Sequence, residues 1–349
     1  MGEPDRDELR RRLLTWYGER KRDLPFRRTR DPYAVLLAEV LLQRTRVAAG
    51  LPFYERFLAA FPTFRDLAAA SEADVLRAWE GLGFYRRARN LHRAARAIVE
   101  RFGGKLPADL DTLRALPGIG DYTAGAVGSI AFGLRAPAVD GNATRVLSRV
   151  FRVKGNVFQG HGKRAIRELA ASLVPAESPG EWNQAVMELG ATVCVPRSPR
   201  CGACPISDEC LAFATGMQDV LPETPAKRKV RTVSVVFVVA RNRDRVLFLR
   251  RKEGLYAGMY GLPGGERNPA ETEEAAVRRH LTSLGVAPRR IEPLGPVRHA
   301  FSHLRWEGTA FRCRARGPPA DGAEWILIGD TGGLPLVPLH RQLVDRAVG

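Results

Sequence analysis

The sequence LPGIGDYTAGA, residues 116–126, lies between two segments in which apolar residues recur every three or four positions, as they do in helices. Gly118 and Gly120 flank Ile119, and they allow the tight turn that would present backbone N–H groups and a helix N-terminus to a phosphate. A simple Pro-Gly turn between helices is the alternative. The stretch therefore predicts a helix, a phosphate-binding hairpin and a second helix over about residues 112–133, the second beginning near Tyr122.

The rest of the chain divides into two regions with different patterns. The chain has 349 residues, a length that predicts two domains. Helical spacing continues to about residue 218, a Pro- and Lys/Arg-rich linker follows at 219–231, and the remainder carries strand-like runs. We expect an all-α domain over 1–218 and an α+β domain over 232–349. The latter has a hairpin at 233–249, a helix at about 270–284, and strands near Leu294, Gly308 and Trp325.

The charge balance indicates an anionic partner. Lys and Arg total 55 against 38 Asp and Glu, a net charge of +17, and only seven of the basic residues are lysines. Arginine suits bidentate contact with phosphate, which favours nucleic acid, although an arginine-rich coding bias would also raise the count. We find no signal peptide or membrane-spanning run, so we expect a cytoplasmic, nucleoid-associated protein.

Four of the five cysteines cluster within a short segment: Cys194, Cys201, Cys204 and Cys210. Such clustering favours a structural metal site in a reducing compartment over disulfides. Four thiolates hold either zinc or a [4Fe–4S] cluster, and spacing alone does not decide between them; four unrelated free thiols are the remaining alternative. We expect the fifth, Cys313, to be a buried apolar residue.

Two acidic residues are candidates for catalysis. Glu39 lies in the apolar run 32–49, which predicts one helix, and apolar surroundings would raise its pKa as a general acid requires. The alternative is a helix-edge carboxylate paired with Arg46. Asp140 and Asn142 stand just before a further predicted helix, so they either only cap it or also lie near a bound nucleotide.

Taken in order, these motifs resemble the helix-hairpin-helix glycosylase superfamily, and within it the MutY-type adenine DNA glycosylases. The resemblance covers nearly the whole chain: LPFRRTRDPYAVLLAEVLLQRTRV, WEGLGFYRRARNLH, LPGIGDYTAGAV, AVDGNATRVLSR, NQAVMELGATVC with the cysteine array, and HAFSHLRW. It implies an enzyme that flips adenine out of a duplex pair with 8-oxoguanine or guanine. It also implies a [4Fe–4S] cluster on Cys194, Cys201, Cys204 and Cys210.

The resemblance assigns roles in the reaction. Glu39 matches the acid that protonates adenine at N7, and Asp140 matches the carboxylate that stabilises the oxocarbenium-like sugar. Tyr122 and Asn142 match supporting positions. The endonuclease III branch has a lysine where this chain has Tyr122, so we expect a monofunctional glycosylase that leaves an abasic site.

Further positions match contacts to DNA and the lesion. Phe84 corresponds to an aromatic wedge. Arg44 replaces a glutamine usual in the family, and this loss of a hydrogen-bond acceptor is expected either to weaken lesion discrimination or to shift it, for example toward guanine. Phe26 replaces a tryptophan, an exchange that we expect to be tolerated. The full set of expected DNA and lesion contacts is Gln43, Arg44, Thr45, Leu82, Phe84, Gly118, Gly120, Phe301, Ser302 and His303.

The C-terminal region resembles a Nudix fold. Gly265, Glu271 and Arg279 have the spacing of the Nudix motif, but His280 to Gly285 lack the glutamates that would bind Mg²⁺. We therefore expect this domain to read the lesion rather than to hydrolyse nucleotides. Although a Phe-Ser-His sequence is usually only a turn, residues 301–303 match the family's loop that tests for 8-oxoguanine.

Two other functions remain as alternatives. A thymine or uracil mismatch glycosylase also fits the tyrosine at position 122, and a non-catalytic damage-binding protein would use the same DNA surface. The lesion-reading domain disfavours the first, and the presence of both Glu39 and Asp140 disfavours the second. We expect a monomer that binds double-stranded DNA containing A:8-oxoguanine or A:G mispairs.

Overall fold

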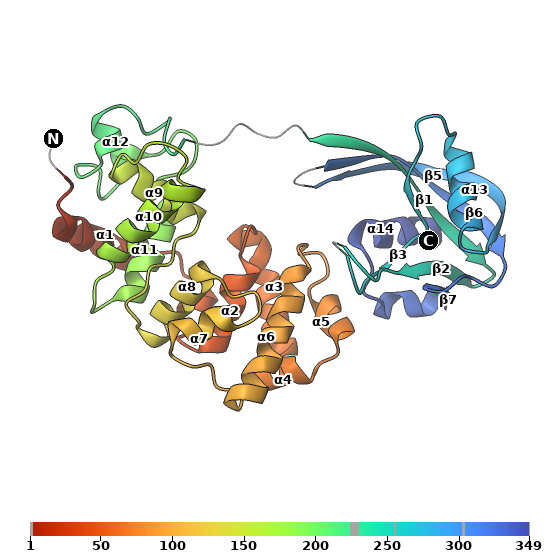
Figure 1. The fold of residues 1–349 in the computed structure, drawn as a ribbon, viewed down its shortest axis with the longest axis horizontal. Helices are drawn as coiled ribbons and strands as arrows, with labels where there is room; N and C mark the ends of the chain where they lie inside the picture. Colours follow the sequence, from red (N-terminus) through yellow and green to blue (C-terminus); the bar gives the residue numbers. More distant parts are fainter. Residues whose placement is uncertain (1–2, 224–229, 255, 302–303, 349) are drawn as a thin grey trace. The chain divides into compact units, whose positions relative to one another are not determined.

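The computed structural model describes residues 3–223, 230–254, 256–301 and 304–348 (Figure 1). Packing divides the chain into two compact units, Met1–Ala69 with Asn90–Ala226 and Ala70–Arg89 with Lys227–Gly349. The first is helical and the second contains the sheet, which confirms the expected fold class. No helix in the described ranges is long and apolar enough to cross a bilayer.

The helical unit is built from short helices, four of which begin at an aspartate whose side chain caps the first turn. Asp5, Asp31, Asp109 and Asp140 each accept hydrogen bonds from backbone N–H groups in the first turn of a helix. The α-helices are α1 Arg6–Arg20, α2 Pro32–Leu41, α3 Val47–Ala60, α4 Phe64–Ala69, α6 Arg86–Phe102, α7 Leu110–Ala115, α8 Asp121–Phe132, α9 Gly141–Val150, α10 Gly160–Leu173, α11 Pro179–Thr192 and α12 Leu211–Ala214, with single 3₁₀ turns at Pro25–Arg27 and Cys201–Ala203.

The predicted single helix over 32–49 is wrong. The chain leaves α2 after Leu41 and re-enters a helix at Val47, and Arg44 between them has a left-handed backbone with φ 59°. A left-handed residue cannot continue a right-handed helix, and the N–H of Thr45 instead bonds to the Leu42 carbonyl at 3.1 Å. Apolar periodicity runs through both helices, so the spacing did not reveal the break.

The second unit contains a seven-stranded sheet in the order β3-β2-β1-β6-β5, with β4 beside β1 and β7 beside β2. The expected hairpin is confirmed: β1 pairs antiparallel with β2, with Arg241 opposite Val246. The long β1–β6 pairing is parallel. The strands are β1 Arg231–Asn242, β2 Arg245–Arg250, β3 Tyr260–Gly261, β4 Gly264–Glu266, β5 Ala287–Ala300, β6 Leu304–Arg316 and β7 Ala323–Leu327.

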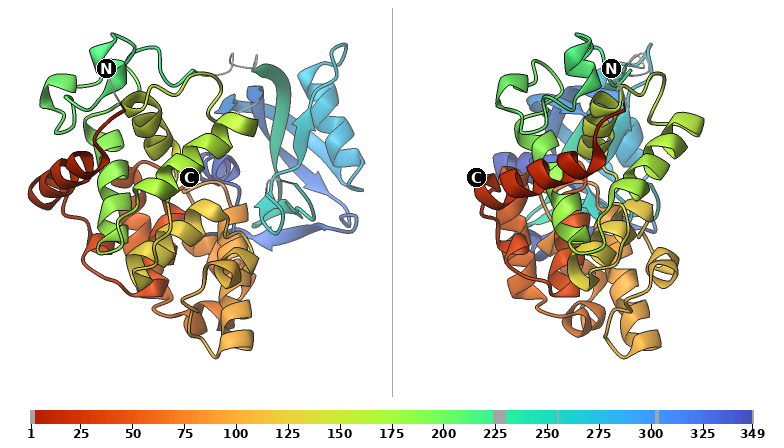
Figure 2. Two further views of the ribbon diagram at one scale, coloured as in Figure 1. Left: turned by 60° about the vertical axis from the view of Figure 1, so that its left-hand side comes forward. Right: turned by 90° about the vertical axis from the view of Figure 1, so that its left-hand side faces the viewer.

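Helices α13 (Glu273–Thr282) and α14 (Pro338–Val348) cover opposite faces of this sheet (Figures 1 and 2). Strand β1 is apolar on both faces because its side chains alternate between them. Val235, Phe237 and Val239 belong to the core on the α14 side. Val236, Val238 and Ala240 belong to the core on the α13 side, together with Cys313, which is buried as expected. A 3₁₀ segment, Ile328–Gly333, precedes α14.

Residues 70–89, including α5 (Glu72–Ala78), belong to the second unit rather than to the N-terminal region in which the sequence placed them. Glu80 forms an ion pair with Arg341 at 2.5 Å, and the Tyr85 ring meets that of Tyr256 edge-on at 6.0 Å. Both contacts join residues far apart in the sequence, so local sequence patterns could not predict them. Within the expected linker, residues 224–229 lie outside the described residues.

Candidate functional site

A groove of about 570 Å³ in the helical unit brings together five of the predicted site residues: Gln43, Gly118, Gly120, Tyr122 and Asp140. They come from the turn after α2, the α7–α8 hairpin and the start of α9. Arg114, Lys163 and Arg167 also line the groove. The groove therefore combines acidic groups with a basic rim, as a site for a phosphodiester substrate requires.

The turn between α7 and α8 is as tight as the sequence predicted. Gly118 has φ 78°, and a Cβ there would lie 2.5 Å from the Cβ of Asn90, so this turn needs glycine. Gly120 stands at the N-cap of α8 and no side chain in the described structure caps the N–H groups there. Free N–H groups at a helix N-terminus suit a phosphate oxygen.

Glu39 is held by Tyr122, whose hydroxyl donates a hydrogen bond to Glu39 Oε2. Burial raises the pKa of Glu39 to about 7, although the Tyr122 hydrogen bond opposes the shift, and the charge of Asp140 adds to it. Within the described residues no ion pair joins Glu39 to Arg46, which was the alternative for this carboxyl. Glu39 is thus about half protonated at neutral pH and can supply a proton there.

Asp140 caps α9 and also lines the groove. Its Oδ1 accepts from the Ala143 N–H at 2.7 Å and its Oδ2 from the Asn142 amide at 2.8 Å. Burial raises the pKa of Asp140, and these two hydrogen bonds oppose that shift. Since its charge raises the pKa of both Glu39 and Tyr122, the three groups lie close together. The sequence placed Asn142 just before the helix, but it lies inside the first turn of α9, because α9 begins at Gly141.

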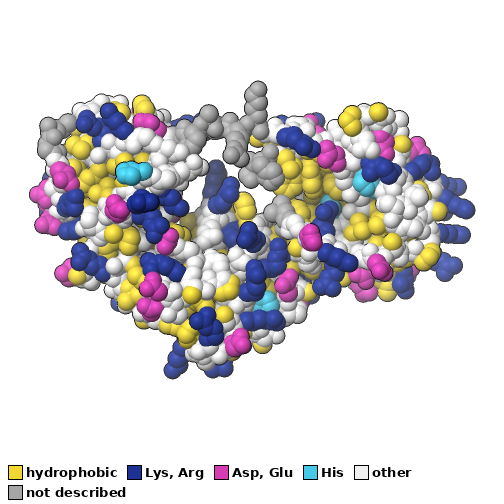
Figure 3. Space-filling view, viewed as in Figure 1, with side chains coloured by type: hydrophobic (Ala, Val, Ile, Leu, Met, Phe, Trp, Pro, Cys, Tyr) yellow, Lys and Arg dark blue, Asp and Glu magenta, His cyan; other side chains and the backbone are white. Residues whose placement is uncertain are grey.

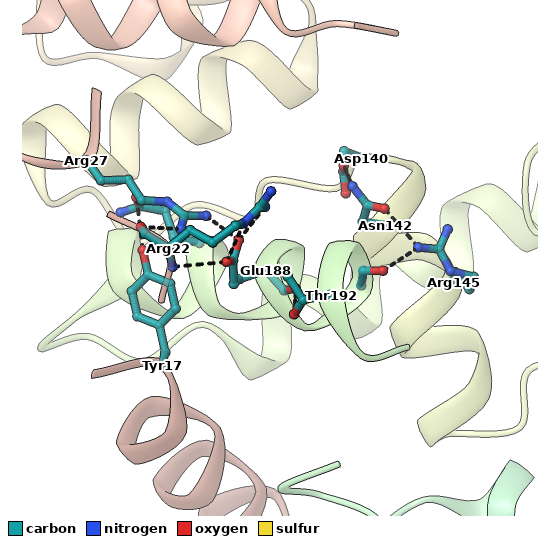
Figure 4. A network of polar contacts seen from close by, with 10 residues as sticks. Tyr17, Arg22, Arg27, Asp140, Asn142, Arg145, Glu188 and Thr192 are labelled. Atoms are coloured by element: carbon teal, nitrogen blue, oxygen red, sulfur yellow. Dashed lines mark hydrogen bonds and ion pairs between the residues drawn. The ribbon is translucent and has the colours of Figure 1, made fainter. Parts of the chain in front are cut away.

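Arg145 fixes Asn142 from behind, a role that sequence reasoning missed (Figure 4). Its Nη2 donates at 2.8 Å to both Asn142 Oδ1 and the Gly190 carbonyl, and its Nε donates at 2.8 Å to the Cys194 carbonyl. Glycine at position 190 allows Asn142 to pack closely against α11, because a Cβ there would lie 2.6 Å from the Cβ of Asn142. The cysteine segment and the Asp140 carboxylate are thereby joined through one guanidinium.

Glu188 on α11 is a second buried carboxylate that the sequence did not single out (Figure 4). Its side chain is 1% exposed and forms ion pairs with Arg22 and Arg27, both at 2.7 Å. Burial raises its pKa, but the hydrogen bonds from the two arginines outweigh that effect and lower the value to about 2. This carboxylate is ionised and braces the chain before α2.

The predicted DNA and lesion contacts are distributed over both units. Gln43 donates to the Thr123 hydroxyl at 3.2 Å, and Arg44 and Thr45 form the turn that follows α2. In the second unit, Phe84 has φ 50° and is 41% exposed, in a loop that also contains the half-buried Leu82. An exposed aromatic ring on a strained loop suits a wedge.

The lesion-reading segment is described only in part. Phe301 packs edge-on against Trp306 with ring centroids 4.7 Å apart, and its N–H bonds to the Leu304 carbonyl at 2.8 Å. Ser302 and His303 lie outside the described residues. The segment connects β5 to β6 at one end of the sheet.

All four clustered cysteines line one small cavity of about 20 Å³. Beside it the buried Arg149 donates to Cys194 Sγ at 3.3 Å, and burial raises the pKa of the Cys204 thiol to about 12. A buried cation needs an anion, which bound thiolates supply, and iron would offset the cost of ionising these thiols. Among the described residues no set of three His, Cys, Asp or Glu is arranged to hold a single metal ion. The four-thiol donor set fits a [4Fe–4S] cluster.

In the second unit, the Nudix-type pair is present without its metal ligands. Glu271 binds Arg279 at 2.8 Å, while positions 280 and 283 are a histidine and a serine. No three carboxylates in the described part of this unit are placed to hold a metal ion. The Nudix-type fold and its Glu271–Arg279 ion pair are present in this unit.

Comparison with protein families agrees with this arrangement. Residues 37–176 match the HhH-GPD superfamily of base excision DNA repair proteins, residues 194–210 the iron-sulfur binding domain of endonuclease III, and residues 235–346 a NUDIX domain. The second match covers the segment that contains the four clustered cysteines, and it identifies the cofactor as a [4Fe–4S] cluster.

Relatives and solved structures are similar over much of the chain. Adenine DNA glycosylase of Rattus norvegicus is 34% identical over 91% of this chain and 73% of its own length, and that of Homo sapiens is 34% identical over 90% and 69%. A solved thermostable thymine-DNA glycosylase has 32% identity and a TM-score of 0.56, covering 60% of this chain and 97% of its own. The chain therefore belongs to the adenine DNA glycosylase family, base-excision-repair enzymes that hydrolyse the N-glycosidic bond of adenine.

Proposed function

We propose that this enzyme acts as a monomer on duplex DNA, removes adenine mispaired with 8-oxoguanine or guanine, and leaves an abasic site without cutting the strand. The observation that carries the proposal is the hydrogen bond to Glu39 from Tyr122, which lines the groove together with Asp140. Adenine must be flipped into this groove, since the bond to be broken is inaccessible within the base stack.

The two carboxyl groups divide the work. Glu39, protonated near pH 7, gives its proton to adenine N7, so that the electron pair of the breaking C1′–N9 bond leaves with a neutral base. The sugar becomes oxocarbenium-like, and the negative charge of Asp140 stabilises it until water adds at C1′ and gives up a proton to the Glu39 carboxylate. Asn142 and the α9 N–H groups keep the Asp140 carboxylate oriented.

Position 122 sets the type of reaction. A strand-cutting lyase forms a Schiff base with the sugar and needs an amine for it. Tyr122 has none, and burial raises the pKa of its hydroxyl well above the ordinary value, so it remains a neutral hydrogen-bond donor. A water molecule is then the group that attacks the sugar.

Lesion recognition belongs to the second unit in this proposal. Its Nudix-like fold lacks the metal-binding carboxylates, and Phe301, Ser302 and His303 match the loop that tests for 8-oxoguanine in the family. Arg44 replaces a glutamine that would contact the base left without its partner. With donors only, Arg44 can bond to O6, the acceptor that guanine and 8-oxoguanine share, but it cannot accept a hydrogen bond from the N7–H that 8-oxoguanine alone carries, which predicts a smaller preference between these bases.

Single-turnover excision from labelled duplexes containing A:8-oxoguanine, A:G or T:G tests the proposal. We expect alkali-dependent cleavage at the first two and none at T:G, with no adduct trapped by borohydride. Tyr122→Lys, which introduces the amine, is the positive control for trapping. If thymine were released faster than adenine, the enzyme would instead be a thymine mismatch glycosylase. Efficient trapping of the unaltered enzyme by borohydride would refute the monofunctional mechanism.

A further inference from the structure

The second unit carries a strongly basic groove of about 680 Å³, formed by ends of β1, β5 and β6. Seven arginines line it against one acidic residue, Glu292, which pairs with Arg312 at 3.0 Å. Within the described residues no other ion pair involves a groove arginine. Figure 3 shows Lys and Arg side chains gathered at the right-hand edge of this unit.

Three of these arginines lie side by side across the sheet. Arg314 on β6 is in register with Arg241 on β1 and with Arg289 on β5. Side chains of paired residues share one face of a sheet, and like charges directly opposite one another are destabilising. The neighbours Cys313 and Ala315 point to the other face, into the core beneath α13. The row is therefore costly for the isolated fold and becomes favourable when an anion lies on it.

The backbone around the groove directs further arginines toward it. Arg290 has φ 50° in the β-bulge that follows Arg289, and Arg243 has φ 56° in the two-residue turn between β1 and β2. Bulges re-aim side chains, and such turn positions favour glycine, asparagine or aspartate. Arginine at both strained positions concentrates charge where the fold alone would favour other residues.

The groove lies at the opposite end of the β5–β6 pair from Phe301. The register runs from Arg289 opposite Arg314 to Ala300 opposite Arg305, which is roughly 35 Å at about 3.3 Å per residue. That length corresponds to about ten base pairs of B-form DNA. A ligand of this groove is thus separate from the base pair that the lesion-reading segment would contact.

We propose that this arginine groove is a second, sequence-independent site for the phosphodiester backbone of duplex DNA. Guanidinium groups bind phosphate oxygens bidentately, and a row of them follows a polyanion better than it fits a compact ligand. The enzyme acts on DNA, so this polyanion is at hand. The inference rests on DNA binding by the family and is independent of the mispair specificity proposed above.

Binding of undamaged duplex tests the groove, with Arg289→Gln/Arg314→Gln as the groove variant. Arg250→Gln/Arg278→Gln, two exposed arginines of the same unit outside the groove, makes the same change in net charge. Fluorescence anisotropy over a salt series gives affinity and salt dependence. We expect the groove variant to bind about tenfold more weakly with a salt slope shallower by roughly 1.8, since each phosphate contact contributes about 0.9.

The control variant should lose less than about twofold in affinity, and both variants should keep the wild-type thermal unfolding and the excision rate at saturating enzyme. Equal losses in the two variants would overturn the proposal. So would a groove variant that binds duplex normally but fails to bind polyglutamate, which would assign the groove to an acidic protein. A failed excision assay with the expected binding difference would reject the mispair assignment and leave this site standing.

Discussion

Two glutamates, one in each unit, show how the same side chain serves different ends. Glu39 has a tyrosine hydroxyl as its hydrogen-bond partner, and burial raises its pKa to about 7. Glu271 accepts hydrogen bonds from the Arg279 guanidinium, which lower its pKa to about 2. A buried carboxyl without a cationic partner keeps a raised pKa and can act as an acid, as Glu39 does. A carboxyl that is paired with a guanidinium has a lowered pKa and stays ionised, as Glu271 does.

The two units also differ in the acidic groups that they contain. The helical unit holds two acidic groups whose pKa values are raised, the usual sign of a reacting site. The second unit keeps the Glu271–Arg279 pair, which supports the fold, and has replaced the metal ligands beside it. Chemistry is therefore expected from the first unit alone.

The largest effect is expected from Glu39→Gln, with Glu271→Gln as its counterpart. Glutamine cannot donate a proton to adenine, so single-turnover excision from A:8-oxoguanine should fall by about 10²- to 10⁴-fold while duplex binding persists. Glu271→Gln should change the rate less than about twofold at matched folding. If the two variants lose similar activity, the division between the units is wrong.

Asp140→Asn should lower the excision rate by about 10²- to 10³-fold, because the negative charge beside the sugar is removed. Asparagine caps helices as well as aspartate does, so stability should be kept. Asp109→Asn is a matched control: Asp109 caps α7 through the Thr112 N–H at 2.7 Å, and it does not line the catalytic groove. Equal rates for the two variants would leave Asp140 with capping alone.

The pH profile offers a smaller, graded test. Glu39 is active when protonated, so the rate should fall by about tenfold per pH unit once pH rises above about 7. Asp140 acts when ionised, and because burial raises its pKa the rate should also fall on the acid side, at a higher pH than for an exposed aspartate. Single-turnover rates between about pH 4 and 9 would show a bell. A profile that stays flat through neutral pH would contradict the role of Glu39.

Local patterns were enough to predict the hairpin, the cysteine cluster and the strands of the second unit, because glycine, cysteine and apolar spacing act over a few residues. They also made Glu39 and Asp140 candidates, but the roles of both residues came from the resemblance to a family. The ion pairs of Glu188 and the bonds of Arg145 depend on residues far apart in sequence. Among 48 arginines, nothing local distinguishes one that holds Asn142 from one that faces solvent.

The break at Arg44 and the position of residues 70–89 escaped prediction for the same kind of reason. A left-handed residue within a continuous apolar run leaves the period unchanged, so sequence spacing extends the helix through it. The segment around Glu80 follows helical residues in sequence, yet Arg341 and Tyr256 draw it into the other unit. Tertiary contacts decided both cases.

Gly190 carries no functional group, yet the Asp140 carboxylate depends on it. A single methyl group there would occupy the space of Asn142, because its Cβ would fall 2.6 Å from that of Asn142. Asn142 would have to shift, and Asp140 would lose the amide that orients it. Repair would then fail through crowding behind the groove, in a protein whose acids, cysteines and DNA-facing residues were all intact.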